Sequence, residues 1–237
     1  MSVRVIIGRN AVKQYLNSNQ HIEKIFVRER QKVNQDLNRL IGQARDQGRH
    51  VQWLAPHKFD DRFSGDHQGI ACILHDFKQY DIADVVRESP QTVMVLDHLN
   101  DPHNFGAICR TAEAFGVRHL IYPKNRAVQI TPSVEKAAAG ATENIVFTKV
   151  TNLRQTLDYL QKNGYWIYAA SSNMGQPIHT VSFNAPRVLI CGSEENGVSP
   201  GLTKLIDEFV HIPMHGKTSS LNVSVATGIM IHTIASQ

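Results

Sequence analysis

Apolar, strand-like runs alternate with helix-like segments along most of the chain. From Thr92 onward, strands are predicted at 92–97, 119–123, 144–150, 165–170, 187–192 and 209–214. Helices are predicted at 105–115, 132–140, 152–163 and 199–208, followed by a mostly buried helix at 220–234. Strands that alternate with helices pair in parallel and need helices on both faces of their sheet. The pattern therefore predicts an α/β fold with a covered parallel sheet.

The first part of the chain shows the same alternation on a smaller scale. The sequence pattern predicts helices at 11–16 and 33–48 and strands at 22–27, 51–55 and 69–74. The polar stretch 77–90, which ends in Pro90, is typical of a linker. We therefore expect a small α/β domain at 1–76, a linker at 77–90 and a larger domain at 91–237.

Bulk properties narrow the class of protein. The chain is 42% apolar and 19% charged, and no apolar run approaches the roughly 20 residues of a membrane helix. The apolar stretch in MSVRVIIGRN is too short for a signal peptide, so a cytoplasmic location is expected. Cys72, Cys109 and Cys191 lack CxxC spacing and are predicted to be buried, reduced thiols.

Positive charge is concentrated in the first third of the chain. Residues 1–80 contain 13 Lys and Arg against 8 Asp and Glu, whereas the remaining residues contain 12 against 13. Such an excess is consistent with a polyanionic partner for the N-terminal part. A solvated helix face explains the charge equally well, and on charge alone both interpretations stay open.

Three loops that directly follow predicted strands are rich in small residues, amides and hydroxyls. In open parallel sheets, ligands bind at the carboxyl ends of the strands, which makes the loops 99–106, 192–197 and 213–222 the candidates. None contains G-x-G-x-x-G or G-x-S-x-G, and HGKTS lacks the first glycine of a P-loop because position 211 is His. Backbone-rich loops of this kind suit a nucleotide-like cofactor without a pyrophosphate.

Four possible metal ligands lie at or near the first of these loops. Asp97, His98, Asp101 and His103 lie close together in the sequence, but their spacing matches no familiar ligand set. An Asp-Pro turn at a helix start explains Asp101 more simply. We therefore expect no metal.

Three ordered motifs in these loops match one family. The first is Asn104, Gly106 and Arg110 in DPHNFGAICR, the second is LICGSEENG, and the third is IPMHGKTSSLNVSVATG. On these motifs the chain resembles the SpoU (TrmH) family of RNA 2′-O-ribose methyltransferases, within the SPOUT class. IIGRNAVKQYL and HQGIACIL resemble the small substrate-binding domain, similar to ribosomal protein L30e, found in the RlmB-like branch of the family.

The resemblance implies a fold and a function. It implies a C-terminal trefoil knot, S-adenosylmethionine bound in that knot, and an active site completed across a homodimer. The implied reaction is 2′-O-methylation of a ribose in RNA, and the RlmB-like branch favours a guanosine in 23S rRNA. A tRNA methyltransferase of the same family, or an RNA-binding or ribosome-assembly factor with an idle site, remain the alternatives.

The resemblance also assigns roles to residues. Arg110, Asn104, Glu194, Ser220 and Asn222 are implied to be catalytic, and Gly192, Ile212 and Leu221 to hold the cofactor's adenine through backbone groups. A guanidinium is effectively never deprotonated, so a charged Arg110 would stabilise the forming alkoxide or bind a phosphate. Capping of a helix is the alternative role of Asn104, Ser220 and Asn222. Glu195 and Asn196 stand where many relatives have a glycine.

Four N-terminal residues are candidates for RNA contacts, namely Arg9, Asn10, Arg39 and Arg45. Phosphate binding by such side chains weakens as salt increases. The alternative is that they only solubilise the helices on which they lie.

Overall fold

The computed structural model describes residues 3–17, 22–30, 35–75, 79–193 and 196–237. The chain divides into two compact units, Met1–Asp76 and Phe77–Gln237, and each is described by itself.

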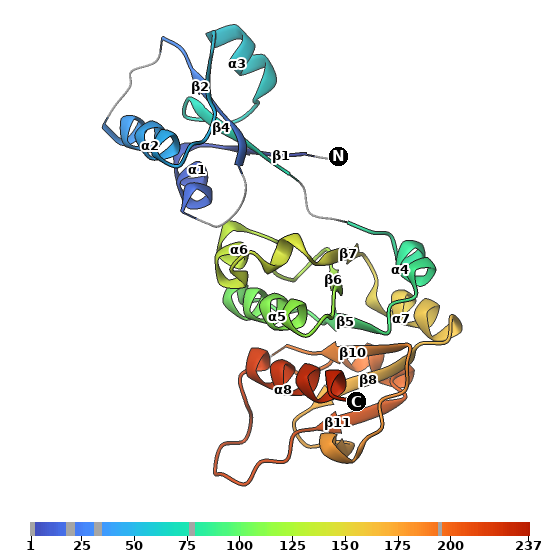
Figure 1. The fold of residues 1–237 in the computed structure, drawn as a ribbon. Coiled ribbons are helices and arrows are strands. Elements are labelled where there is room, and N and C mark those ends of the chain that lie inside the picture. The colour runs from blue at the N-terminus through green and yellow to red at the C-terminus, as the bar shows by residue number, and fades with distance from the viewer. Residues whose placement is uncertain (1–2, 18–21, 31–34, 76–78, 194–195) are drawn as a thin grey trace. The chain divides into compact units, whose positions relative to one another are not determined.

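The N-terminal unit is a four-stranded sheet with helices on both faces (Figure 1). Its elements are β1 (Val3–Ile7), α1 (Arg9–Leu16), β2 (Ile22–Arg28), α2 (Gln35–Asp46), β3 (Val51–Leu54), α3 (Pro56–Arg62) and β4 (Ile70–His75). The strand order is β1-β4-β2-β3, in which β4 runs antiparallel to β1 and β2, and β2 and β3 are parallel. The patterns at 3–7 and 56–62 were not recognised as a strand and a helix in the sequence.

Successive side chains along the strands point to opposite faces of the sheet, which gives this unit two hydrophobic cores. Ile25 and Val27 face α1 and α2, where they pack with Leu37 and Leu40. Phe26, on the opposite face, packs with Phe59 of α3. The helix predicted at 33–48 is therefore present as α2, and its one-sided apolar spacing is what buries it against the sheet.

The C-terminal unit is built on a seven-stranded sheet whose neighbouring strands are all parallel. The strands are β5 (Thr92–Leu96), β6 (His119–Pro123), β7 (Val146–Val150), β8 (Trp166–Ser171), β9 (Gln176–Pro177), β10 (Arg187–Cys191) and β11 (Glu208–His211), in the order β7-β6-β5-β10-β8-β11-β9. The α-helices are α4 (Ile82–Glu88), α5 (Pro102–Ala114), α6 (Pro132–Ala138), α7 (Leu153–Lys162) and α8 (Val223–Ala235). Short 3₁₀ helices lie at Ala141–Glu143, Ile178–Thr180 and Pro200–Leu205.

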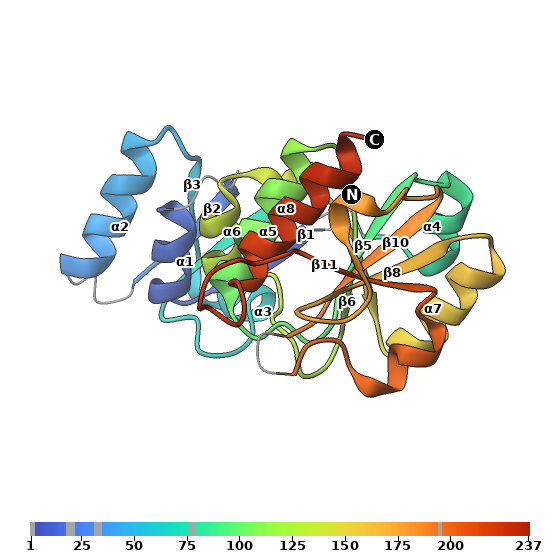
Figure 2. The ribbon, with the colours of Figure 1, turned by 90° about the horizontal axis from the view of Figure 1, so that it is seen from below.

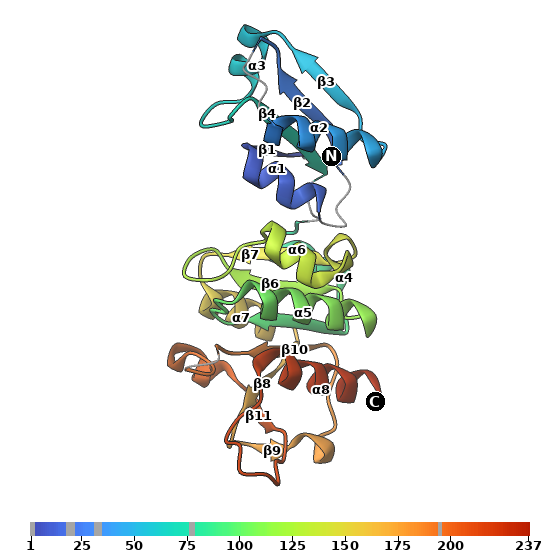
Figure 3. The ribbon, with the colours of Figure 1, turned by 90° about the vertical axis from the view of Figure 1, so that its left-hand side faces the viewer.

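Helices cover both faces of this sheet. Met94 and Leu96 of β5 pack toward α5, α6 and α8, whereas Val93 and Val95 pack toward α4 and α7. Figure 2 shows the two helical layers on either side of the sheet, and Figure 3 shows α6, α5 and α8 side by side across one face. The predicted α/β class with a covered parallel sheet is confirmed, whereas the trefoil knot and the likeness to ribosomal protein L30e stay predictions.

Some local predictions need correction. The helix predicted at 199–208 is a 3₁₀ helix of six residues, and Ile82–Glu88, inside the predicted linker, form α4. The final helix is not mostly buried, because Val225 is 51% exposed and Ile229 is 39% exposed. Helix α8 is apolar on all sides but packs through only one of them, where Met230 and Ile231 are buried.

Candidate active site

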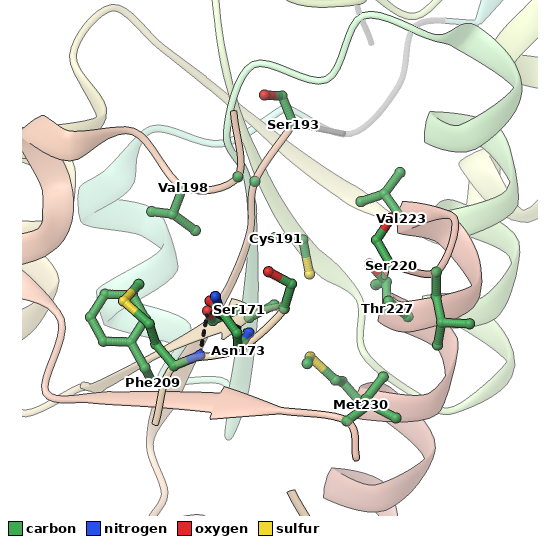
Figure 4. A pocket seen from close by; sticks show the side chains of 18 of the residues that line it. Ser171, Asn173, Cys191, Ser193, Val198, Phe209, Ser220, Val223, Thr227 and Met230 are labelled. Carbon is green, nitrogen blue, oxygen red and sulfur yellow. Dashed lines mark hydrogen bonds between the residues drawn. The ribbon is translucent and has the colours of Figure 1, made fainter. Parts of the chain in front are cut away.

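A cavity of about 410 Å³ lies at the carboxyl edge of the large sheet. The loops after β8, β10 and β11 and the first turns of α8 form its walls, and the strand order places the ends of these three strands side by side. Ligand pockets in proteins span about 300–1,000 Å³, so the cavity can hold a cofactor of nucleoside size. Figure 4 shows Cys191 at its floor, between Phe209 and Val198 on one side and Thr227 and Met230 of α8 on the other.

The loop after β10 brings bare backbone to the cavity. Gly192 follows the strand directly, and a Cβ atom at this position would lie 2.1 Å from the carbonyl carbon of Gly197. Ser193 and Gly197 close the loop with two backbone hydrogen bonds, of 3.0 and 2.9 Å. Only glycine fits at position 192, so at this point the wall presents peptide groups to a ligand.

The remaining walls are mainly apolar, with a few polar groups. Ile212, Met214 and Met230 line the cavity, and the hydroxyl of Ser171 accepts a hydrogen bond of 3.0 Å from the backbone N–H of Met174. An apolar pocket with a few fixed polar groups is the usual environment of an organic cofactor.

Thr227 was missed in the sequence. It lines the cavity, is 1% exposed, and its hydroxyl interacts with the thiol of Cys191, which is a weak hydrogen-bonding group. The thiol of Cys191 lies beside it, and burial raises the pKa of that thiol to about 11. A buried hydroxyl beside an open cavity is a group that a ligand could satisfy. The helical spacing of Val223, Thr227 and Met230 was the available signal, because it places all three on one face.

The structure brings four of the predicted site residues to this cavity. Gly192, Ile212 and Leu221 line it, and so does Ser220. Their roles toward a cofactor stay predictions, but their convergence from two separate motifs shows that these motifs build one site.

The first motif reaches the third through an amide pair. Asn104 on α5 is 7% exposed, and its Oδ1 accepts a hydrogen bond of 3.0 Å from Nδ2 of Asn222. Asn222 is also the N-cap of α8, because its Oδ1 accepts from the backbone N–H of Ser224 at 2.9 Å. The helix-capping role expected as an alternative for Asn222 is therefore confirmed. Ser220 does not cap this helix.

The expectation that Asn104 caps α5 was wrong, because Asp101 is the N-cap of that helix. The Asp101 carboxylate accepts from the backbone N–H of His103 at 2.9 Å, and Pro102 occupies the first helical position, which needs no N–H. Asp97 is fully buried, with one carboxylate oxygen 2.5 Å from Nδ1 of His98 and the other accepting from the N–H of Ser199. Asp97 thus joins β5 to the segment that follows β10.

Arg110 does not reach the cavity of its own chain. It is exposed on α5, on the side opposite the buried residues Phe105, Ile108 and Ala112, and does not line the cavity. Its guanidinium makes no hydrogen bond or ion pair with the described residues. Glu194, together with Glu195, lies outside the described residues.

The candidate RNA-contact residues lie on α1 and α2. The Arg9 guanidinium donates to the backbone oxygen of Gln68 at 3.1 Å, and Asn10 is exposed. Arg39 and Arg45 are exposed on α2, which also carries Asp36 and Asp46. Their contacts with RNA stay predictions.

A parallel sheet with a cofactor-sized cavity at its carboxyl edge defines an α/β domain of the kind that binds nucleotide-like cofactors. Residues 91–232 match the SpoU rRNA Methylase family, and residues 5–80 match the model for RNA 2′-O ribose methyltransferase substrate binding. The chain belongs to the SpoU rRNA methylase family, which confirms the resemblance seen in its three motifs.

Individual relatives agree with this membership. A protein of Staphylococcus haemolyticus assigned to the TrmH family of tRNA/rRNA methyltransferases is 36% identical over 97% of this chain and 94% of its own. The A. aeolicus TrmH/SpoU tRNA modifying enzyme is 31% identical, with a TM-score of 0.57 over 66% of this chain and 80% of its own. An AdoMet-bound rRNA methyltransferase of Sinorhizobium meliloti shares the fold, with a TM-score of 0.66 and 21% identity over 98% of this chain and 86% of its own.

Proposed function

We propose that this protein transfers the methyl group of S-adenosylmethionine to the 2′-hydroxyl of a guanosine ribose in 23S rRNA. The observation that carries the proposal is the convergence of the three family motifs. Backbone and side chains of the second and third motifs line one cavity, and Asn104 of the first is hydrogen-bonded to Asn222 of the third.

The cavity suits S-adenosylmethionine. Its volume, its apolar walls and the bare backbone at Gly192 fit an adenosine group, and the buried Thr227 hydroxyl is available to a polar atom of the ligand. When bound, S-adenosylmethionine supplies a methyl group activated by a sulfonium centre. The AdoMet-bound Sinorhizobium meliloti enzyme, which shares this fold, supports the assignment. Gly192, Ile212 and Leu221 would hold the adenine through their backbone groups.

The residues of the chain then have separable tasks. Asn222 begins α8 and, through Asn104, fixes that helix start against α5. Ser220 would line the transfer centre from the same loop. The guanidinium of Arg110 would stabilise the developing alkoxide or hold the adjacent phosphate. Glu194 would complete the site from the second motif.

The outward direction of Arg110 supports a homodimer. An arginine that points away from the cavity of its own chain can serve a cavity only if a second copy brings one to it. Helix α8 offers a surface for such pairing, since Val225 and Ile229 are exposed apolar residues one turn apart. We therefore expect two copies to pack through α8 and α5.

The N-terminal unit would bind the RNA. It matches a substrate-binding family model, and the excess of positive charge in residues 1–80 suits a polyanion. A tRNA substrate is the alternative, since the A. aeolicus relative is named as a tRNA modifying enzyme. An idle site is disfavoured because Asn104, Arg110, Ser220 and Asn222 are all present, and Asn104 is hydrogen-bonded to Asn222. None of the described helices is long and apolar enough to cross a membrane, and a cytoplasmic location stays a prediction.

Methyl transfer from labelled S-adenosylmethionine to unmodified 23S rRNA and to bulk tRNA, in parallel, tests the proposal. We expect label in the 23S rRNA, and nucleoside analysis should locate it on 2′-O-methylguanosine. Label in tRNA alone would select the tRNA alternative. Binding of S-adenosylmethionine by calorimetry, with no transfer to either RNA, would select the non-catalytic alternative.

A further inference from the structure

We propose that a second cavity, at the amino-terminal edge of the large sheet, binds a phosphate group, with Arg187 as its buried anchor. This cavity has a volume of about 520 Å³. Its walls come from the starts of β5, β6 and β10 and from the ends of α5 and α8. The inference does not depend on the proposed methyl transfer.

The two cavities lie at opposite ends of the same strands. Arg187 begins β10 and lines the second cavity, whereas Cys191 ends β10 and lines the first. Four residues of extended strand separate these positions by about 13 Å. Ligands could therefore occupy both cavities at once.

Arg187 is a buried cation without an anionic partner. It is 8% exposed, its Nε donates to Oγ1 of Thr92 at 3.0 Å, and its Nη1 donates to the backbone oxygen of Phe183 at 2.5 Å. Within the described chain, Nη2 has no hydrogen-bond partner and no carboxylate pairs with the guanidinium. Burial lowers the pKa of Arg187, but a guanidinium this basic stays charged. A buried charge is costly unless an opposite charge meets it, and an anion in the cavity would supply that charge.

The surroundings of Arg187 are built to hold it in place. The side chain of Gln237 accepts from the backbone N–H of Phe183 at 3.1 Å and donates to the carbonyl of Val181 at 3.0 Å. These two bonds hold the segment around Phe183, and the carbonyl of Phe183 accepts from Nη1 of Arg187. The guanidinium is thus positioned by neutral groups on two sides, with its remaining N–H groups left for a ligand.

Two arginines line the cavity, which also meets the negative ends of two helices. Arg118 lines it and is exposed, which adds a second cation at the rim. The carboxylate of Glu88 is already engaged by Nε2 of His119, at 3.3 Å, and by the hydroxyl of Tyr80. The ends of α5 and α8 each contribute about half a negative charge at most. At α5 this charge is reduced, because the N–H groups of Phe115 and Val117 bond the last carbonyls.

A phosphate suits this site better than a carboxylate. A guanidinium pairs with phosphate oxygens through parallel N–H bonds, and a second arginine at the rim matches the second charge of a phosphate monoester. The volume exceeds what an inorganic phosphate fills and falls in the range of organic ligands. The expected ligand class is therefore a phosphate carried by a nucleoside-sized group, either a free nucleotide or an RNA phosphate.

Calorimetry on the full-length protein saturated with S-adenosylmethionine tests the site with four probes. The probes are inorganic phosphate, guanosine monophosphate, guanosine, and a short oligoribonucleotide. We expect saturable binding of the monophosphate, weaker binding of inorganic phosphate, and no binding of guanosine. If the oligoribonucleotide binds more tightly than the monophosphate, and Arg187→Gln abolishes that gain, the natural source of the phosphate is RNA; otherwise it is a free nucleotide.

Variants make the test specific to this cavity. Arg187→Gln should weaken binding of the monophosphate about tenfold or more. Arg118→Ala, at the exposed rim, should weaken it by a smaller factor and guards against misfolding of the buried variant. Arg154→Ala removes an exposed charge from α7 and should change nothing. Lack of saturable binding by either phosphate probe, equal binding by guanosine, or unchanged affinity in both cavity variants would overturn the proposal.

Discussion

The side-chain amide of Asn222 donates a hydrogen bond of 3.0 Å to Oδ1 of Asn104, across 118 residues of sequence. The same Asn222 side chain accepts from the first turn of α8 through its oxygen. One residue therefore ends the loop that lines the cavity, starts the last helix and ties that helix to α5. Asn104 is 7% exposed and Asn222 is exposed, so the bond ties a buried amide of α5 to the exposed start of α8.

This pair predicts an energetic coupling that a double-mutant cycle can measure. Asn222→Ala should lower the free energy of unfolding by about 1–2 kcal/mol, since it removes an N-cap as well as the amide pair. Asn104→Ala should cost about 0.5–1.5 kcal/mol, because it removes one hydrogen bond and leaves the exposed Asn222 amide free to bond water. The double variant should cost less than the sum, by about 0.5–1.5 kcal/mol. Strict additivity in denaturant unfolding would show that the two amides act independently.

Substitution of Gly192 should specifically weaken cofactor binding. In Gly192→Ala the new methyl group would collide with the backbone at Gly197, so the loop must move away from the cavity. We expect the affinity for S-adenosylmethionine, measured by calorimetry, to fall about tenfold or more. Gly201→Ala is the matched control, because a Cβ atom there would meet nothing within 4 Å. Equal affinities of the two variants would mean that this loop does not hold the cofactor.

Much of this architecture could be predicted from the sequence, and the failures have identifiable causes. The parallel sheet was predictable because apolar strands and one-sided helices alternate. The cap of α5 was misassigned to Asn104, although the Asp-Pro pair at 101–102 is the stronger signal. The exposure of Val225 was not predictable from the pattern, because α8 is apolar on every side and the pattern does not tell which face is covered.

The site was less accessible to sequence reasoning than the fold. Gly192 and Ile212 present backbone groups to the cavity, and no side-chain pattern reveals that role; the family resemblance supplied these residues. The direction of Arg110 could have been predicted, because it lies opposite Phe105 and Ile108 on the helical wheel. Arg187 lies at the start of a strand, away from the loops that the parallel-sheet rule selects, so its cavity was found only in the structure.

Charged residues in place of the exposed apolar pair Val225 and Ile229 on α8 should weaken self-association. Val225→Glu and Ile229→Glu place charges on the proposed contact surface, and either should shift the protein toward monomer in analytical ultracentrifugation. Val5→Glu, at an exposed apolar position in the N-terminal unit, is the matched control and should leave the oligomeric state unchanged. An unshifted dimer in both α8 variants would place the interface elsewhere.

If Arg110 serves the cavity of a partner copy, two inactive variants of the protein should restore each other's activity. Arg110→Ala should abolish methyl transfer yet leave the affinity for S-adenosylmethionine unchanged, because the residue does not line the cavity. Gly192→Ala should lack a working cavity but keep its arginine. If Arg110 serves the cavity of the partner copy, a mixed dimer contains one complete site. Co-refolding equal amounts of the two variants should then restore about a quarter of the wild-type activity, since half of the dimers are mixed and each has one site of two. Mixtures that stay inactive while mixed dimers form would show that Arg110 acts within its own chain. In that case α5 would have to turn toward the cavity when RNA binds.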